Sequence, residues 1–155
     1  MNDRVRILLE ENSDVPLTDE LLNEIVETDS LDNFFATNHV HKYSLEDFLA
    51  ILLEEKDLKQ SAVVRDADIN ATYGYEIFTG RKKSPSRDIM IKLALAMQCN
   101  LDDTNRLLKI SNNSELYAKS KRDVIIIYAI MHRYSIIDTN HELYRFGQPL
   151  LGEEK

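Results

Sequence analysis

The sequence predicts an all-α fold, and three observations support this prediction. The 155 residues include only four glycines and three prolines, so few positions favour the tight turns of a β fold. Apolar residues recur at the i, i+3, i+4 spacing of amphipathic helices. The C-terminal half also contains two similar helical patterns, whose matching residues lie 35 positions apart. These features together predict a bundle of short helices.

The charge of the chain is negative overall but unevenly distributed. The formal net charge is -8. Residues 1–58 contain four Lys/Arg against 15 Asp/Glu, whereas residues 59–123 contain 12 against eight. Residues 124–155 are close to neutral, with three against four. The middle third of the chain could therefore attract a polyanion, although the whole chain would not.

Several classes of function are disfavoured by the composition. The single Cys99 rules out an internal disulfide, and its apolar neighbours predict a small buried side chain. No signal peptide and no apolar run of about 20 residues is present, which favours a cytoplasmic protein of bacterial type. No catalytic triad or phosphate-binding glycine loop is found. His39 and His41 are expected to lie on the surface of a linker, so we expect no metal site there. Because the catalytic motifs are absent as well, we expect no enzyme activity and no cofactor.

Residues 1–43 are predicted to form an acidic N-terminal helical segment and linker. A helix is expected over residues 18–28, where Thr18 can act as the N-cap. Residues 30–43 have a less regular pattern and are expected to link this helix to the rest of the chain. The apolar stripe of the helix consists of Leu21, Leu22, Ile25 and Val26.

Residues 44–111 are predicted to form the central domain. Ser44 and Asp47 form a cap-like pair at the start of its first helix. Two short helices are expected next, at about 60–67 and 71–79, with a tight connection at Ile69 and Asn70. The second of these ends at Gly80, as is typical of a left-handed helix terminator. The buried face of the first helix is predicted to contain Leu45, Phe48, Leu49, Leu52 and Leu53, and that of the third Gly74, Ile77 and Phe78.

Residues 112–148 are predicted to form a C-terminal helical hairpin packed on the central domain, followed by a tail at 149–155. This hairpin resembles the one that begins at Arg87, and the match indicates either a duplication or two merely similar hairpins. The identical pairs are Arg87/Arg122, Asp88/Asp123, Ile91/Ile126, Ala94/Ala129, Asp103/Asp138, Thr104/Thr139, Asn105/Asn140 and Leu108/Leu143.

Two short helices joined tightly, with cations after the second, are a candidate helix-turn-helix. Such a motif places its second helix in the major groove of DNA, where small or polar side chains face the bases. The outward positions are Thr72, Tyr75, Glu76 and Thr79, with Ala71 and Tyr73 at the margins. The expected phosphate contacts are Arg81, Lys82, Lys83 and Arg87, with Lys59 and Lys92 as further candidates.

Gln60, the Ile69–Asn70 turn and the run "IFTGRKKSPS" from Ile77 to Ser86 resemble the Xre/Cro, lambda-repressor-like helix-turn-helix family. The resemblance covers about 44–111 and implies a compact five-helix bundle. It places Gln60, Ala71, Thr72 and Glu76 at the positions that face bases or the DNA backbone. The chain also resembles a subgroup with an added C-terminal helical pair. The resemblance implies a transcriptional regulator that binds double-stranded DNA sequence-specifically, expected as a homodimer.

A protein–protein interaction adaptor on the same helical fold is the alternative, because fold alone does not determine function. Glu76 is acidic at a position that faces the groove, and tyrosines could anchor a protein interface. The acidic N-terminal segment could bind a protein partner, or it could mask the basic surface. Deletion of residues 1–43 would then strengthen DNA binding.

Overall fold

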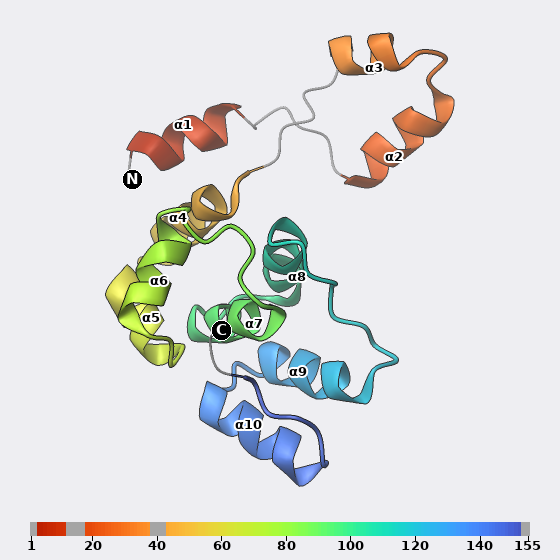
Figure 1. The fold of residues 1–155 in the computed structure, drawn as a ribbon. Coiled ribbons are helices and arrows are strands. Elements are labelled where there is room, and N and C mark those ends of the chain that lie inside the picture. Colours follow the sequence, from red (N-terminus) through yellow and green to blue (C-terminus); the bar gives the residue numbers. More distant parts are fainter. Residues whose placement is uncertain (1–2, 12–17, 38–42, 153–155) are drawn as a thin grey trace. The chain divides into compact units, whose positions relative to one another are not determined.

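The computed structural model describes residues 3–11, 18–37 and 43–152. These residues form ten helices and no strand (Figure 1), which confirms the prediction of an all-α protein. Every helix within these ranges is too short or too polar to cross a membrane. The chain divides into two compact units, residues 1–43 and residues 44–155, which are described separately below.

The first unit contains three short helices, α1 (Asp3–Glu11), α2 (Thr18–Glu27) and α3 (Leu31–Thr37). α2 lies where the sequence pattern predicts it. α3 corrects the prediction of an irregular linker over residues 30–43: it starts where Phe34 N donates to Ser30 O at 3.0 Å. The ring of Phe34 is buried and packs edge-on against that of Phe35. His39 and His41 lie outside the described residues.

The second unit begins with α4 (Leu45–Glu55), α5 (Gln60–Asp66) and α6 (Ala71–Phe78). Ser44 caps α4, because its hydroxyl accepts a hydrogen bond from Asp47 N at 3.2 Å. α6 packs against both α4 and α5. These three helices match the predicted elements to within a residue or two. Each has an apolar buried face, and side chains cap α4 and α6, whereas no side chain caps α5.

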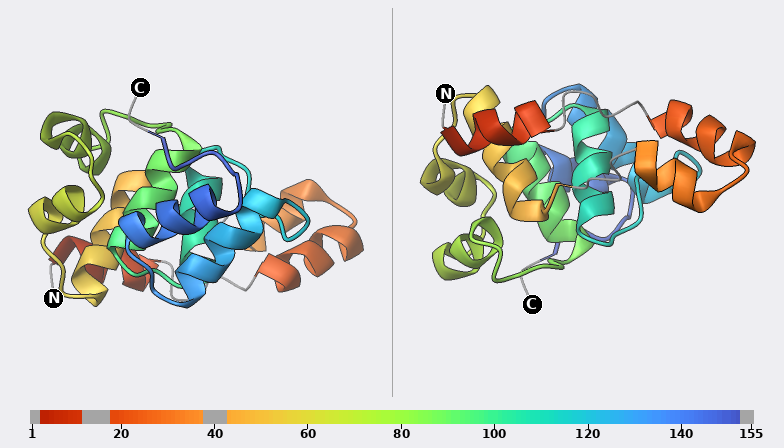
Figure 2. Two further views of the ribbon diagram at one scale, coloured as in Figure 1. Left: turned by 90° about the horizontal axis from the view of Figure 1, so that it is seen from below. Right: turned by 90° about the horizontal axis from the view of Figure 1, so that it is seen from above.

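Four helices follow: α7 (Arg87–Ala96), α8 (Leu101–Ile110), α9 (Lys121–Met131) and α10 (Ile136–Arg145). α7 is the central helix of this unit and is in contact with α5, α8 and α10. The view from below shows α10 beside both α7 and α9 (Figure 2). All seven residues from Ile89 to Leu95 are buried. The largest fully buried side chains of this unit are Leu49, Leu52, Ile77, Ile89, Met90, Ile91, Leu93, Met97, Leu107, Leu108, Ile126 and Leu143.

The hairpins α7–α8 and α9–α10 share their backbone conformation as well as their sequence pattern. Asn100 and Ser135, 35 positions apart, cap their second helices in the same way. The four residues with left-handed backbone also come in matching pairs, Gln98 (φ 52°) with Arg133 (φ 55°) and Asn112 (φ 65°) with Gly147 (φ 68°). This agreement favours a duplicated unit over two hairpins that merely resemble each other.

Each hairpin holds the other through an Arg–Asp pair. Arg87 donates to both carboxylate oxygens of Asp123, with N–O distances of 2.9 and 2.8 Å. Arg122 makes the reciprocal pair with Asp88, at 3.0 and 2.9 Å. The two pairs are equivalent, because Arg87 and Arg122 occupy matching positions in the repeat, as do Asp88 and Asp123. Reciprocal contacts of this kind are typical of a twofold-symmetric interface. The two hairpins therefore pack on each other as two subunits of a symmetric dimer would.

The segments that follow α8 and α10 are fixed by the same arginines. Arg87 also donates to Ser114 O and Glu115 O, each at 3.0 Å. The equivalent acceptors for Arg122 are Pro149 O at 2.9 Å and Leu150 O at 3.0 Å. Residues 149–152 of the predicted tail are thus bonded to α9, and to α7 through Gly152 N, which donates to Asp88 at 2.8 Å.

The two aspartates ionise more readily than free carboxyl groups. Burial alone would raise the pKa of Asp88, but hydrogen bonds from Arg122 and Gly152 N outweigh burial and lower the pKa below its ordinary value of 3.8. Burial opposes ionisation of Asp123 in the same way, and Arg87 with Tyr117 N lowers the pKa of that carboxyl too. Both carboxylates are therefore charged at neutral pH.

Candidate nucleic-acid interface

The candidate interface consists of α5, the turn from Ala67 to Asn70, α6 and the cations that follow α6. The turn contains one left-handed residue, Asp68 (φ 55°), between the buried Ala67 and Ile69. Asn70 then caps α6, because its side-chain oxygen accepts hydrogen bonds from Thr72 N at 2.9 Å and Tyr73 N at 3.3 Å. The connection between the two helices is therefore short and well defined.

Gly74 is needed because α5 and α6 approach each other closely. A Cβ atom placed on Gly74 would lie 2.6 Å from Val64 Cγ1, which is a severe overlap. Ile77 is fully buried on the same face of α6, whereas Phe78 is half-buried. This packing fixes which side of α6 is turned away from the bundle.

Three of the four residues predicted to point outward lie on the exposed side of α6, and the fourth, Glu76, does not. Ala71, Thr72, Tyr75 and Thr79 are exposed, while Tyr73 and Glu76 are half-buried at its edges. The hydroxyl of Thr79 donates back to Tyr75 O at 2.8 Å, which leaves its lone pairs as acceptors. Gln60, the first residue of α5, is half-buried. The outward side therefore offers small, hydroxyl and phenol groups, which suit contact with the edges of bases.

Two of the predicted cations lie against aromatic rings of α6. Arg81 Cζ lies 5.9 Å from the centre of the Tyr75 ring, and Lys82 Nζ lies 5.3 Å from that of Tyr73. Lys82 N also donates to Glu76 O at 2.9 Å, which folds the segment back along the end of α6. Lys83 is exposed next to them. The positive charges are thus held beside the outward residues of α6.

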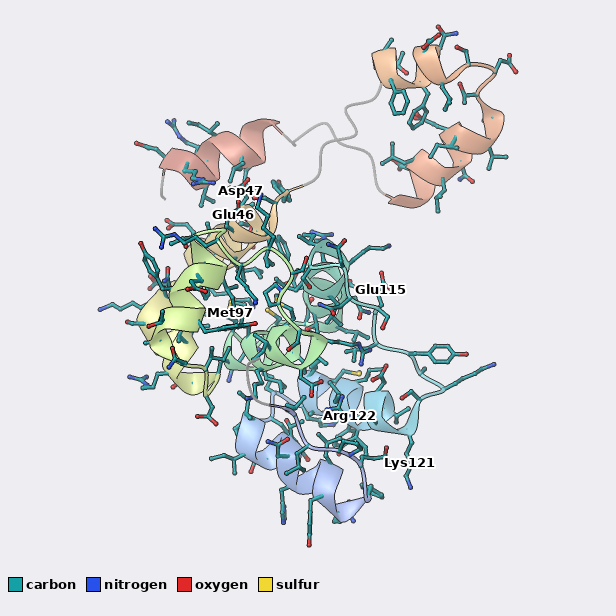
Figure 3. The ribbon with its side chains drawn as sticks, in the orientation of Figure 1. Glu46, Asp47, Met97, Glu115, Lys121 and Arg122 are labelled. Atoms are coloured by element: carbon teal, nitrogen blue, oxygen red, sulfur yellow. The ribbon has the colours of Figure 1, made fainter. Side chains whose placement is uncertain are left out.

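Acidic groups border this positive region. Glu46, labelled at the start of α4 in Figure 3, lies next to Gly80: a Cβ atom on Gly80 would be 2.7 Å from its carboxylate. Gly80 also has a left-handed backbone (φ 82°), so a larger residue would be strained as well as crowded. The net field at the end of α6 is therefore weaker than three adjacent cations alone would give.

Two of the cations predicted to contact phosphate are placed elsewhere. Arg87 engages four of its five N–H groups inside the protein, with Asp123, Ser114 and Glu115 as acceptors. The pKa of its guanidinium is raised, chiefly by the hydrogen bond to Asp123. Lys92 is buried. Neither side chain can reach a phosphate without breaking its packing. The sequence does indicate that Arg87 joins the two hairpins, because Arg87 belongs to the Arg-Asp pair that recurs in the repeat.

Cys99 is a buried thiol. Burial raises the pKa of the Cys99 thiol to about 12, so the reactive thiolate is suppressed, and the predicted buried position is confirmed. Within the described ranges, no group of three or more His, Cys, Asp or Glu side chains is arranged to hold a metal ion.

Comparison of the chain with protein-family models, with curated proteins and with solved structures found no match in any of the three.

Proposed function

We propose that the chain is a sequence-specific DNA-binding transcriptional regulator in which α5 and α6 act as a helix-turn-helix. The observation that carries this proposal is the position of Arg81 and Lys82 against Tyr75 and Tyr73, which gathers positive charge beside the exposed side of α6. In this proposal α4 to α8 form the five-helix bundle that the family resemblance implies. α6 has eight residues and is about 12 Å long, which suits the width of a major groove.

The residues divide between the two tasks of DNA recognition. Thr72, Tyr75 and Thr79 on α6 would contact base edges, and Ala71 would approach a thymine methyl group. Arg81, Lys82 and Lys83 would bind phosphates and fix the helix in register. Glu76 at the edge would accept from cytosine N4, which gives the site a base preference at the expense of non-specific affinity.

The number of available cations limits the affinity of one chain. Lys59, Arg81, Lys82 and Lys83 are the candidates that remain after Arg87 and Lys92 are removed. Four phosphate contacts predict that log K falls against log salt with a slope of about -3.6. Non-specific binding of such a surface is weak, on the order of 10⁻⁴ to 10⁻⁶ M, so useful regulation would require two copies on two half-sites.

The test is the salt dependence of binding to duplex DNA, followed by fluorescence anisotropy. We expect the triple variant Arg81→Ala, Lys82→Ala, Lys83→Ala to bind about tenfold or more weakly and to show a slope nearer -1. The matched control replaces three other exposed or partly exposed cations, Lys56, Lys109 and Lys119, by alanine and removes the same charge. Equal losses in both variants, or no binding at low salt, would favour the adaptor function instead.

A further inference from the structure

The outer side of α10 carries large apolar residues where the equivalent helix of the repeat carries charges. Ile137 and Tyr144 are 81% and 77% exposed, and His141 between them is exposed as well. The matching positions of α8, 35 residues earlier, are all exposed and are occupied by Asp102, Arg106 and Lys109. α8 thus has the charged residues that suit a helix side facing water, whereas α10 has apolar ones. Large apolar side chains on an exposed helix face indicate a site of interaction.

The exposed side chains of α10 form two rows along the helix. Ile137 and Tyr144 are seven residues apart and lie on nearly the same side, because seven residues make about two helical turns. Asp138 and Arg145 are also exposed and form a second row beside the first. His141 lies between the two rows and midway along them. One row is therefore apolar, and the other has a negative charge at one end and a positive charge at the other.

The charges around α10 balance each other. Apart from the two Arg–Asp pairs, the acidic groups on the helix and near its ends are Asp102, Asp138 and Glu142, and the basic groups are Lys121, Arg133 and Arg145. Arg133 lines a shallow hollow together with Asp102. Arg145 pairs with Glu142 at 2.9 Å, and its side chain stays 61% exposed. The surface has no net charge, so it does not favour a strongly charged partner, and its two ends differ in sign.

We propose that α10 packs antiparallel on α10 of a second copy of the chain, with His141 next to the twofold axis. An antiparallel twofold pair places each row against its own counterpart, so Ile137 lies opposite Tyr144 of the second copy. Asp138 then lies opposite Arg145 of the second copy, and this ion pair forms twice. A parallel pair would place the apolar row of one chain against the charged row of the other. The two rows therefore fit a second copy in the antiparallel orientation.

The position of α10 in the second unit leaves its outer side accessible. In the view from below, α10 is nearest the viewer and no other helix of this unit lies over it (Figure 2). A dimer through α10 would bring two α6 helices into one particle, as two DNA half-sites require. The inference does not depend on DNA binding, because α5 and α6 take no part in the contact.

Charge reversal at the two ends of α10 tests the proposal on the full-length chain by sedimentation equilibrium. The wild type should dimerise with a dissociation constant on the order of 10⁻⁶ to 10⁻⁵ M, because one short helix makes a small interface. Asp138→Lys and Arg145→Glu should each raise this constant at least about tenfold, because like charges then lie opposite each other twice. An equimolar mixture of the two variants should form a heterodimer, and the double variant should dimerise as the wild type does, because opposite charges meet again.

The equivalent helix α8 provides matched controls. Asp103→Lys and Lys109→Glu reverse the same charges in the first and last turns of α8, so both variants should dimerise as the wild type does. Ile137→Lys with Tyr144→Lys should abolish the dimer, because it replaces the apolar row by like charges. Circular dichroism checks that each variant is folded.

Three results would overturn the proposal. The first is a wild type that is monomeric at about 100 μM. The second is an unchanged dissociation constant in the α10 variants, or an equal loss of dimer in the α8 controls. The third is the absence of dimer from both the mixture and the double variant, since the charges would then not act between chains. Because no DNA is present, these results are separate from the salt titration that tests the proposed function.

Discussion

The two hairpins of the second unit, α7–α8 and α9–α10, are joined by equivalent contacts, but their first helices are buried to different extents. The contacts between them are reciprocal, in the pairs Arg87–Asp123 and Arg122–Asp88. Each hairpin also repeats the same internal bond: Leu116 N donates to Asn105 Oδ1 at 2.9 Å, and Leu151 N donates to Asn140 Oδ1 at 2.8 Å. The outer faces of the two hairpins differ in burial. α7 is buried on every side from Ile89 to Leu95, whereas α9 is buried only on the side that meets its neighbours. Residues that are identical in the two repeats therefore make the contacts between the hairpins. Residues that differ between the repeats determine whether the outer face of each hairpin is buried.

The largest difference is expected at the equivalent positions Leu93 and Tyr128. Leu93→Ala should lower the free energy of unfolding by about 2–5 kcal/mol, because it leaves a cavity in the core where Leu93 is fully buried. Tyr128→Ala should cost less than about 1 kcal/mol, because that ring is half exposed. Urea denaturation at low protein concentration measures both values. Similar costs at the two positions would contradict the difference in burial between the outer faces of α7 and α9.

A smaller effect is expected from the two Arg–Asp pairs, which test the agreement between the hairpins. Asp123→Ala should cost about 2–4 kcal/mol, because it leaves the guanidinium of Arg87 without its carboxylate. Asp88→Ala should cost somewhat less, because the side chain of Asp88 is 24% exposed against 7% for Asp123. Double-mutant cycles with Arg87→Ala and Arg122→Ala measure the two coupling energies. A strong coupling in one pair and none in the other would contradict the reciprocal interface.

Acidification should weaken both pairs together. The pKa values of Asp88 and Asp123 are lower in the folded than in the unfolded chain, so the folded state binds fewer protons. Their contribution to stability is complete above the ordinary value of 3.8 and is lost as the pH falls through the lower folded values. Urea titrations between about pH 6 and pH 2 follow this loss. The double variant Asp88→Asn, Asp123→Asn should depend less steeply on pH in this range, and an unchanged slope would assign the loss to other carboxylates.

The sequence predicted local structure well wherever a cap and an apolar face coincide. Ser44, with Asp47 three residues on, was recognisable as the start of a helix, and it accepts the expected backbone hydrogen bond. α3 was missed because its seven residues contain too few turns to show a period. α1 was missed although Val5 and Leu8 have helical spacing and are buried, because nine residues contain too few turns to establish the period.

The candidate site was predicted less completely than the helices. The exposed side of α6 follows from its own apolar face, so Thr72, Tyr75 and Thr79 could be identified from their spacing. The role of Arg87 depends on Asp123, 36 residues away, and its only signal in the sequence is the Arg-Asp pair that recurs 35 positions later; the residues next to Arg87 would suit a phosphate contact equally well. The contacts of Arg81 and Lys82 with tyrosine rings also depend on how the chain turns at Gly80.

The smallest effect is expected from Glu76→Gln at the edge of the candidate interface. Removal of this charge beside Lys82 should strengthen non-specific DNA binding a few-fold, by roughly 0.5–1 kcal/mol, because repulsion from phosphates is lost. It should also weaken any preference for cytosine. Anisotropy with a random duplex and with a selected duplex separates the two effects. A uniform loss of affinity would mean that Glu76 supports the fold of α6 instead of facing DNA.

Selection of genomic DNA fragments by the purified full-length chain, followed by sequencing at two ionic strengths, tests the central claim most directly. If α6 reads bases, a shared sequence should be enriched at both ionic strengths and should disappear with the Arg81→Ala, Lys82→Ala, Lys83→Ala variant. Recovery of fragments without a common sequence, or of none at either ionic strength, would contradict DNA recognition by this surface and leave the adaptor function.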